Sequence, residues 1–170
     1  MSVTITSKNI NRYRSKVDTH TTVIVWQAGS LDHSALSNFP NIRKIDWSHN
    51  KSASLEGIER YPQLTEFVCC FVELTSLAFL KYLPQLRKLD CSFNKLESLA
   101  GLEYTPQLQV LECSRNRLVS LAGIEHLPKL QVLDCPNNQL TSLVGLEHCL
   151  KLRELNCTDN CLESLAGLEY

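Results

Sequence analysis

Apolar and polar residues follow one another along this chain in a pattern that returns every 22 residues. When the first residue of each repeat is counted as position 0, apolar side chains fall at positions 2, 5, 7, 12, 15 and 18, and asparagine at position 10. Self-similarity at a fixed period of this length indicates a stack of repeats. Five prolines and one leucine mark the starts: Pro40, Pro62, Pro84, Pro106, Pro128 and Leu150. The repeats are 40–61, 62–83, 84–105, 106–127, 128–149 and 150–170.

Each repeat is expected to open with a short strand and to return through turns. Apolar positions 5 and 7 alternate with outward positions 4, 6 and 8, so a strand is predicted at about positions 3 to 8. Apolar positions 12, 15 and 18 recur every third residue, which favours a 3₁₀-like return path over a long α-helix. Glycine at position 17, as in Gly101, permits a turn of positive φ.

The repeat 84–105 shows the full pattern, L-x-x-L-x-C-x-x-N-x-L-x-x-L-x-x-L. It resembles the 22-residue class of the leucine-rich repeat family, as in the bacterial internalins and a regulatory subunit of protein phosphatase 1. The resemblance implies an α/β fold, a right-handed leucine-rich repeat solenoid. In it a curved parallel β-sheet forms the concave face, and 3₁₀ helices and turns form the convex face. A repeat fold by itself says little about function.

Residues 1–39 are predicted to form a tail and an N-terminal capping unit. The segment 18–39 is a degenerate repeat with Val23 and Val25 at positions 5 and 7, and the β-prone run 22–26 supplies the first strand. Residues 1–17 carry four basic side chains and no acid. A solvated tail or capping strand is favoured there over a nucleic-acid arm.

Two buried ladders are predicted inside the stack. The cysteines at position 7 are expected to act as small apolar core residues with inert thiols: Cys69, Cys91, Cys113, Cys135 and Cys157. The asparagines at position 10 are expected to bond backbone groups where the strand turns away: Asn50, Asn94, Asn116, Asn138 and Asn160. Val72 replaces asparagine in repeat 62–83, so that turn is expected to be distorted or hydrated.

Composition narrows the class of protein. The 170 residues contain 17 basic and 18 acidic side chains, which favours neither a nucleic-acid nor a membrane partner. There is no apolar run of signal-peptide or transmembrane character, and a ladder of reduced thiols fits a reducing compartment, so a cytoplasmic protein is expected. No cofactor, metal site or catalytic set is recognisable at known spacing.

Function is predicted to lie on the concave sheet face, where strands present outward side chains at positions 4, 6 and 8 and border side chains at positions 3 and 9. The three adjacent acids of position 6, only partly offset by Lys88 and Arg87, favour a basic protein partner. Phe71 and Phe93 either anchor an interface or pack locally over the strand ends. The residues predicted to bind the partner are Asp90, Glu112, Asp134, Val68, Phe71, Phe93, Val110 and Val132.

Two other features leave alternatives open. His126 and His148 at position 20 are either metal ligands or a pH sensor, or solvated residues, and the last is favoured. The last repeat has no polar cap, which predicts end-to-end pairing of two copies, continuation of the chain, or fraying of 150–170.

The function predicted from the sequence is that of a non-catalytic protein-interaction module or scaffold. The alternative is the recognition or regulatory part of a larger enzyme complex, with catalysis outside these residues.

Overall fold

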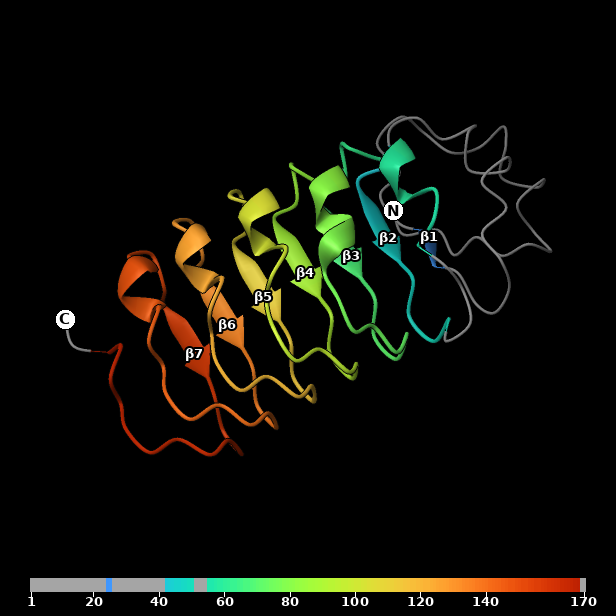
Figure 1. The fold of residues 1–170 in the computed structure, drawn as a ribbon. Helices are drawn as coiled ribbons and strands as arrows, with labels where there is room; N and C mark the ends of the chain where they lie inside the picture. Colours follow the sequence, from blue (N-terminus) through green and yellow to red (C-terminus); the bar gives the residue numbers. More distant parts are fainter. Residues whose placement is uncertain (1–23, 26–41, 51–54, 169–170) are drawn as a thin grey trace.

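The computed structural model describes residues 24–25, 42–50 and 55–168 (Figure 1). Seven strands form one parallel sheet in which each strand pairs with the next in chain order. The strands are β1 Ile24–Val25, β2 Lys44–Asp46, β3 Glu66–Val68, β4 Lys88–Asp90, β5 Val110–Glu112, β6 Val132–Asp134 and β7 Glu154–Asn156. The 3₁₀ helices are η1 Ile58–Arg60, η2 Ala78–Tyr82, η3 Leu102–Tyr104, η4 Ile124–His126 and η5 Leu146–His148. The predicted tail and most of the predicted capping unit lie outside the described residues.

The pairing register reproduces the 22-residue period from β2 to β7: Leu89 pairs with Leu111, and Leu111 with Leu133. From β2 to β6 each strand buries its central residue and half-exposes the two beside it, as the two-residue period predicts. Strands β2 to β7 cover positions 4 to 6 and are shorter than the predicted positions 3 to 8. Hydrogen bonds between repeats nevertheless continue past them, as from Cys91 N–H to the Glu112 carbonyl, 2.8 Å.

The predicted register of the first strand is wrong by one residue. A 22-residue spacing would set Val23 opposite Ile45, whereas Ile24 pairs with Ile45 and Val25 with Asp46. The degenerate first unit lacks the repeated side chains that hold the later units at 22 residues, and its strand lies 21 residues before β2.

The return path is built from single 3₁₀ turns, as the three-residue spacing predicted. In four repeats glycine precedes the turn at positive φ, for example 114° at Gly101. Repeat 62–83 has Phe79 in place of glycine, and its helix η2 begins earlier, after Leu77 at φ −101°. Phe79 then packs edge-on against Phe67, with ring centroids 5.6 Å apart. A longer 3₁₀ helix therefore replaces the glycine turn in this repeat.

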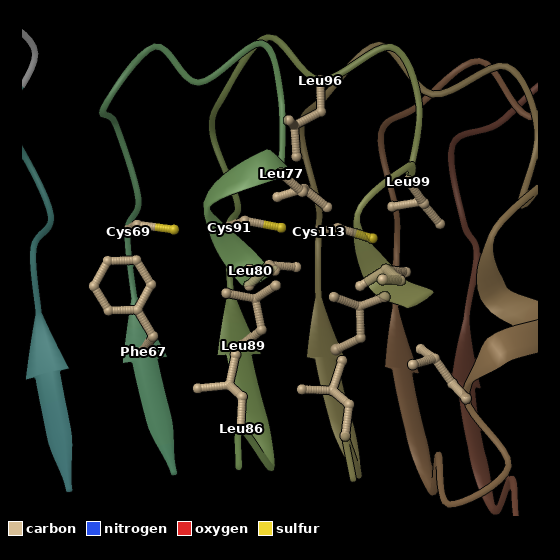
Figure 2. Close-up of a cluster of buried hydrophobic side chains, with 14 of the residues drawn as sticks. Phe67, Cys69, Leu77, Leu80, Leu86, Leu89, Cys91, Leu96, Leu99 and Cys113 are labelled. Carbon is tan, nitrogen blue, oxygen red and sulfur yellow. The ribbon is translucent and has the colours of Figure 1, made fainter. Parts of the chain in front are cut away.

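The core is a set of parallel rows, one for each inward position (Figure 2). Figure 2 shows the sulfur atoms of Cys69, Cys91 and Cys113 in one line above the row that holds Phe67 and Leu89. The predicted cysteine ladder is confirmed: the thiols at positions 69, 91, 113 and 135 are fully buried, and Cys157 packs half-buried against the core. One buried row was not predicted, at position 21: Tyr61, Leu83, Thr105, Leu127 and Cys149.

Candidate protein-binding surface

The predicted site residues on the strands lie side by side across the sheet. Asp90 pairs with Glu112, and Glu112 with Asp134, so the acids occupy adjacent strands β4, β5 and β6. Val110 and Val132 are neighbours in the same two strands. The outward residues of these three strands, and Val68 of β3, are half-buried rather than fully exposed. The strands thus hold both chemical types at fixed intervals on one surface.

The three acids differ in what neutralises them. Lys88 Nζ lies 2.8 Å from Glu112 Oε1, and this hydrogen bond raises the pKa of Lys88. Asp90 Oδ1 accepts the N–H of Ser92 at 3.0 Å, and Asp134 Oδ1 accepts the amide of Asn156 at 2.7 Å. Within the described ranges no lysine, arginine or histidine forms an ion pair with Asp90 or Asp134. Of the three acids, Asp90 and Asp134 therefore keep a negative charge that no neighbouring cation neutralises.

The border row at position 9 forms a continuous stack of planar side chains. The rings of His49 and Phe71 are parallel within 10° at a centroid distance of 4.7 Å. Phe71 and Phe93 stack at 4.2 Å and 22°, and the guanidinium of Arg115 lies 5.3 Å from the Phe93 ring. Stacked strands repeat every ~4.8 Å, so equivalent rings in neighbouring repeats meet at stacking distance. We call these four residues the aromatic row.

The aromatic row shows how the two phenylalanines pack, one of the two roles that the sequence left open for them. Phe71 and Phe93 do pack locally, against each other, yet the side chain of Phe93 stays 40% exposed. His49 and Arg115 were not predicted as members. Their signal in the sequence is that they share position 9 with the two phenylalanines.

Position 9 has an unusual backbone for such residues. Phe71 and Phe93 adopt φ of 57° and 58°, and Arg115 adopts 52°. A bulky residue with positive φ is an outlier that costs on the order of 1–2 kcal/mol. The fold requires this conformation at position 9 whatever residue stands there, because Asn137 and Asp159 adopt it too. Phenylalanine is thus carried here at a cost that asparagine avoids.

Cys70 lies between the acids and the aromatic row. Burial and its hydrogen bond to the Asp90 carboxylate raise the pKa of this thiol to about 12. The buried thiols of the cysteine ladder behave alike: burial raises the pKa of Cys69, Cys91 and Cys113, and that of Cys135 to about 12. These thiols are neutral near pH 7, so none of the five is set up as a nucleophile.

The histidines at position 20 sit on the convex side. His126 and His148 are exposed on η4 and η5, with Nε2 3.8 and 3.7 Å from the carboxylates of Glu125 and Glu147. Hydrogen bonds from its own N–H and from Gly123 N–H lower the pKa of Glu125. Across the described part of the chain, no three ligand-type side chains converge as a metal site would require.

No helix in the described ranges has both the length and the apolar character needed to cross a bilayer.

Comparison with known proteins identifies the repeats. Residues 106–148 and 128–170 match the family model for leucine rich repeats (2 copies). Residues 106–170 are thus leucine-rich repeats, and the 22-residue register that runs through the earlier strands is consistent with the class that the sequence predicted. A search of curated proteins finds no matching sequence.

Solved structures similar in fold include three internalins of Listeria monocytogenes. Internalin C2 superposes with a TM-score of 0.81 at 20% identity, over 99% of this chain and 73% of its own. Internalin InlF gives 0.65 at 16% identity, over 89% and 52% of the two chains. The functional domain of InlJ, which includes a cysteine ladder, gives 0.60 at 24% identity, over 86% and 36%. At these identities the likeness establishes the fold, a curved leucine-rich repeat solenoid.

Proposed function

We propose that this chain is a non-catalytic protein-interaction module whose concave sheet face binds a protein partner of basic character. The observation that supports this most directly is the aromatic row, in which Phe93 is exposed and Phe71 half-buried, beside carboxylates that have no ion pair in the described ranges. Stacked rings beside unneutralised charge supply both apolar contact and electrostatic steering. Because no cation of the described residues pairs with these carboxylates, a basic side chain of a partner can form a new ion pair with them.

The test is affinity capture with charge-reversed bait. The double variant Asp90→Lys with Asp134→Lys should lose the partners that the parent chain captures, because both strands then repel a basic surface. The matched control is Glu97→Lys with Glu163→Lys, the same charge change at two exposed residues outside the strands. Equal capture by the strand variant and the control would reject the concave face as the binding surface.

The alternative role, as the recognition or regulatory part of a larger enzyme complex, is distinguished by what the bait brings down. An enzyme whose rate changes when this chain is added at stoichiometric amounts would support that role. A partner without catalytic activity supports the scaffold role.

Two further parts of the proposal concern assembly and location. Pairing of two copies through the last repeat is supported by exposed Leu165, at 66%, and is tested by sedimentation equilibrium. A single protomer mass at every concentration would reject it. A reducing, cytoplasmic location is supported by the eight free cysteines and is tested by fractionation of the source cell.

A further inference from the structure

The unpaired carboxylates of the concave face alternate by strand. Asp46 of β2, Asp90 of β4 and Asp134 of β6 occupy equivalent places in the sheet register. In the described ranges none of the three has an ion pair, whereas Glu112 of the intervening β5 is bonded to Lys88 and β3 presents Val68. With strands ~4.8 Å apart, single negative charges therefore recur about every 9.6 Å along the solenoid axis.

The aromatic row runs beside this charge row in the same direction. Between them lie the small residues of position 8, where the N–H groups of Ser48 and Ser92 bond the carboxylates of Asp46 and Asp90. Phe93 follows Ser92 directly and stays 40% exposed. The face therefore offers two parallel tracks, one negative every second strand and one aromatic at consecutive repeats.

A peptide that follows both tracks must repeat near 9.6 Å. An extended strand repeats every ~6.8 Å on one face. An α-helix advances 5.4 Å per turn, so that two turns overshoot by about 1 Å at each interval. A polyproline II helix has three residues per turn and a rise of ~3.1 Å, which gives ~9.3 Å. Only the last stays in step with three successive carboxylates to within about 1 Å.

We propose that the concave face binds a polyproline II segment with arginine or lysine at every third residue, lying along the solenoid axis. The basic side chains meet Asp46, Asp90 and Asp134, and the neighbouring edge of the helix sets prolines against His49, Phe71 and Phe93. Aromatic side chains are the usual partners of polyproline II segments. The negative track selects a basic peptide and repels nucleic-acid phosphates. The inference rests on the proposed function and narrows it to one partner chemistry.

The probe is a fluorescein-labelled peptide of five Arg-Pro-Pro units, titrated with the full chain and followed by fluorescence anisotropy at physiological salt. The comparison peptide has the same composition, with its five arginines in one block followed by ten prolines. The Arg-Pro-Pro peptide should bind at least about fivefold more tightly, because it alone can meet three carboxylates at once and each exposed charge pair adds modestly to the affinity. Equal affinity of the two peptides, or no binding by either, overturns the proposal.

Variants locate the contact. Asp90→Asn should weaken the Arg-Pro-Pro peptide about threefold, and the triple change at Asp46, Asp90 and Asp134 about twentyfold. The matched control Glu97→Gln removes the same charge from an exposed site off the strands and should leave affinity within twofold, a change of about 0.4 kcal/mol. A loss with Glu97→Gln equal to that with Asp90→Asn would mean non-specific attraction and reject the proposal.

Phe93→Asn tests the aromatic track separately. Asparagine accepts the positive φ of position 9, so the thermal midpoint should not fall, while affinity for the peptide should drop about threefold. Unchanged affinity would remove the aromatic row from the site and overturn the two-track geometry. If the peptide fails but the lysine reversals still abolish partner capture, the interaction module stands with a ligand of another shape.

Discussion

A single asparagine of the position 10 ladder serves the backbone of two repeats. The Nδ2 of Asn116 donates to the carbonyl oxygens of Cys91 at 3.0 Å and Cys113 at 3.1 Å. Its Oδ1 accepts the buried N–H of Leu96 at 3.0 Å. Both carbonyls also receive a second asparagine, Asn94 and Asn138 respectively. The N–H of Leu96 is therefore the group that depends on Asn116.

Repeat 62–83 shows how the chain adapts when this side chain is missing. The N–H of Val72 donates to Oδ1 of Asn94, a bond that the later repeats lack. The N–H of Leu74 and the carbonyl of Cys69 also bond Asn94, as the equivalent groups bond Asn116 in the next repeat. Glu73 takes a positive φ of 64°, which position 11 does not show in the repeats from 84 onward. The predicted distortion of this turn is therefore observed, and it keeps the backbone groups bonded.

Asn116→Val should destabilise the protein by about 2–4 kcal/mol. The buried N–H of Leu96 loses its acceptor, at a cost of about 1–3 kcal/mol, and the amide bonds are lost as well. Urea unfolding followed by circular dichroism measures the change. Gln139→Val, at an exposed neighbouring site of the next repeat, is the control and should stay within about 0.5 kcal/mol. A similar small effect for Asn116→Val would show that the turn adapts as it does at Val72.

The buried thiols predict a loss of stability at alkaline pH. A thiol ionises near pH 9 in the unfolded chain but only near pH 12 at Cys135 in the folded one, because burial raises its pKa. Above pH 9 the unfolded state therefore binds fewer protons than the folded state. The free energy of unfolding keeps its maximum value below pH 9 and falls as pH rises towards 12. Each such thiol contributes about 1.4 kcal/mol per pH unit in that window.

Replacing Cys113 by alanine should make this alkaline slope shallower by about 1.4 kcal/mol per pH unit. Urea titrations between pH 9 and 11 with a phosphine reductant measure the slope, and the loss of core volume affects only the intercept. Cys161→Ser, which removes an exposed thiol, is the control. An identical slope in parent and Cys113→Ala protein would mean that this thiol is not held neutral by the fold.

The return turn is the element in which the backbone sets the tightest limits. At Gly101 a Cβ atom would lie 2.6 Å from the carbonyl oxygen of Leu77, in addition to the cost of φ at 114°. At Gly145 the φ is 109°, but the nearest atom is a methyl of Ile124 at 3.0 Å, on a side chain that can move. The two glycines thus share the conformational requirement and differ in the clash.

Alanine at these two sites separates the effects. Gly145→Ala should cost about 1–2 kcal/mol, the penalty for an L-residue at positive φ. Gly101→Ala should cost at least about 1 kcal/mol more, because backbone of the preceding repeat must shift. Thermal and urea unfolding of both variants measure the difference. Equal losses would show that the turn of repeat 62–83 yields freely.

Elements that repeat were predictable from sequence, and contacts that depend on the backbone between them were not. The period places Leu89, Cys91 and Asn94 because nearly all of the six copies align the same residue types. The buried row of position 21 was not predicted because it contains a polar residue, Thr105. The Thr105 hydroxyl can be buried because it donates to the Leu102 carbonyl at 3.0 Å. The stacking in the aromatic row was not predicted because it depends on the positive φ of position 9. Phenylalanine, the residue type at position 93, rarely adopts that conformation.

At the scale of the whole molecule, each repeat touches its neighbours in the stack, so stability sums over repeats and their interfaces. Stacking of the repeats spaces equivalent side chains ~4.8 Å apart, one strand spacing. On the concave face, Asp46, Asp90 and Asp134 lie on every second strand. The distance between two of these charges is thus set by the number of repeats that separate them.

Deleting residues 106–127 tests the effect of charge spacing on binding without changing any remaining side chain. Thr105 then joins Pro128, which reproduces the native Thr-Pro junction, and Asp90 becomes the direct neighbour of Asp134. Because each repeat contacts only its neighbours, the shortened chain should keep its far-ultraviolet circular dichroism per residue and, with one interface fewer, unfold at a lower temperature. Its affinity for the Arg-Pro-Pro peptide should fall about threefold or more, since only Asp46 and Asp90 stay two strands apart. If the shortened chain folds and binds the peptide as tightly as the parent, charge spacing does not select the partner, and the attraction is one of total charge alone.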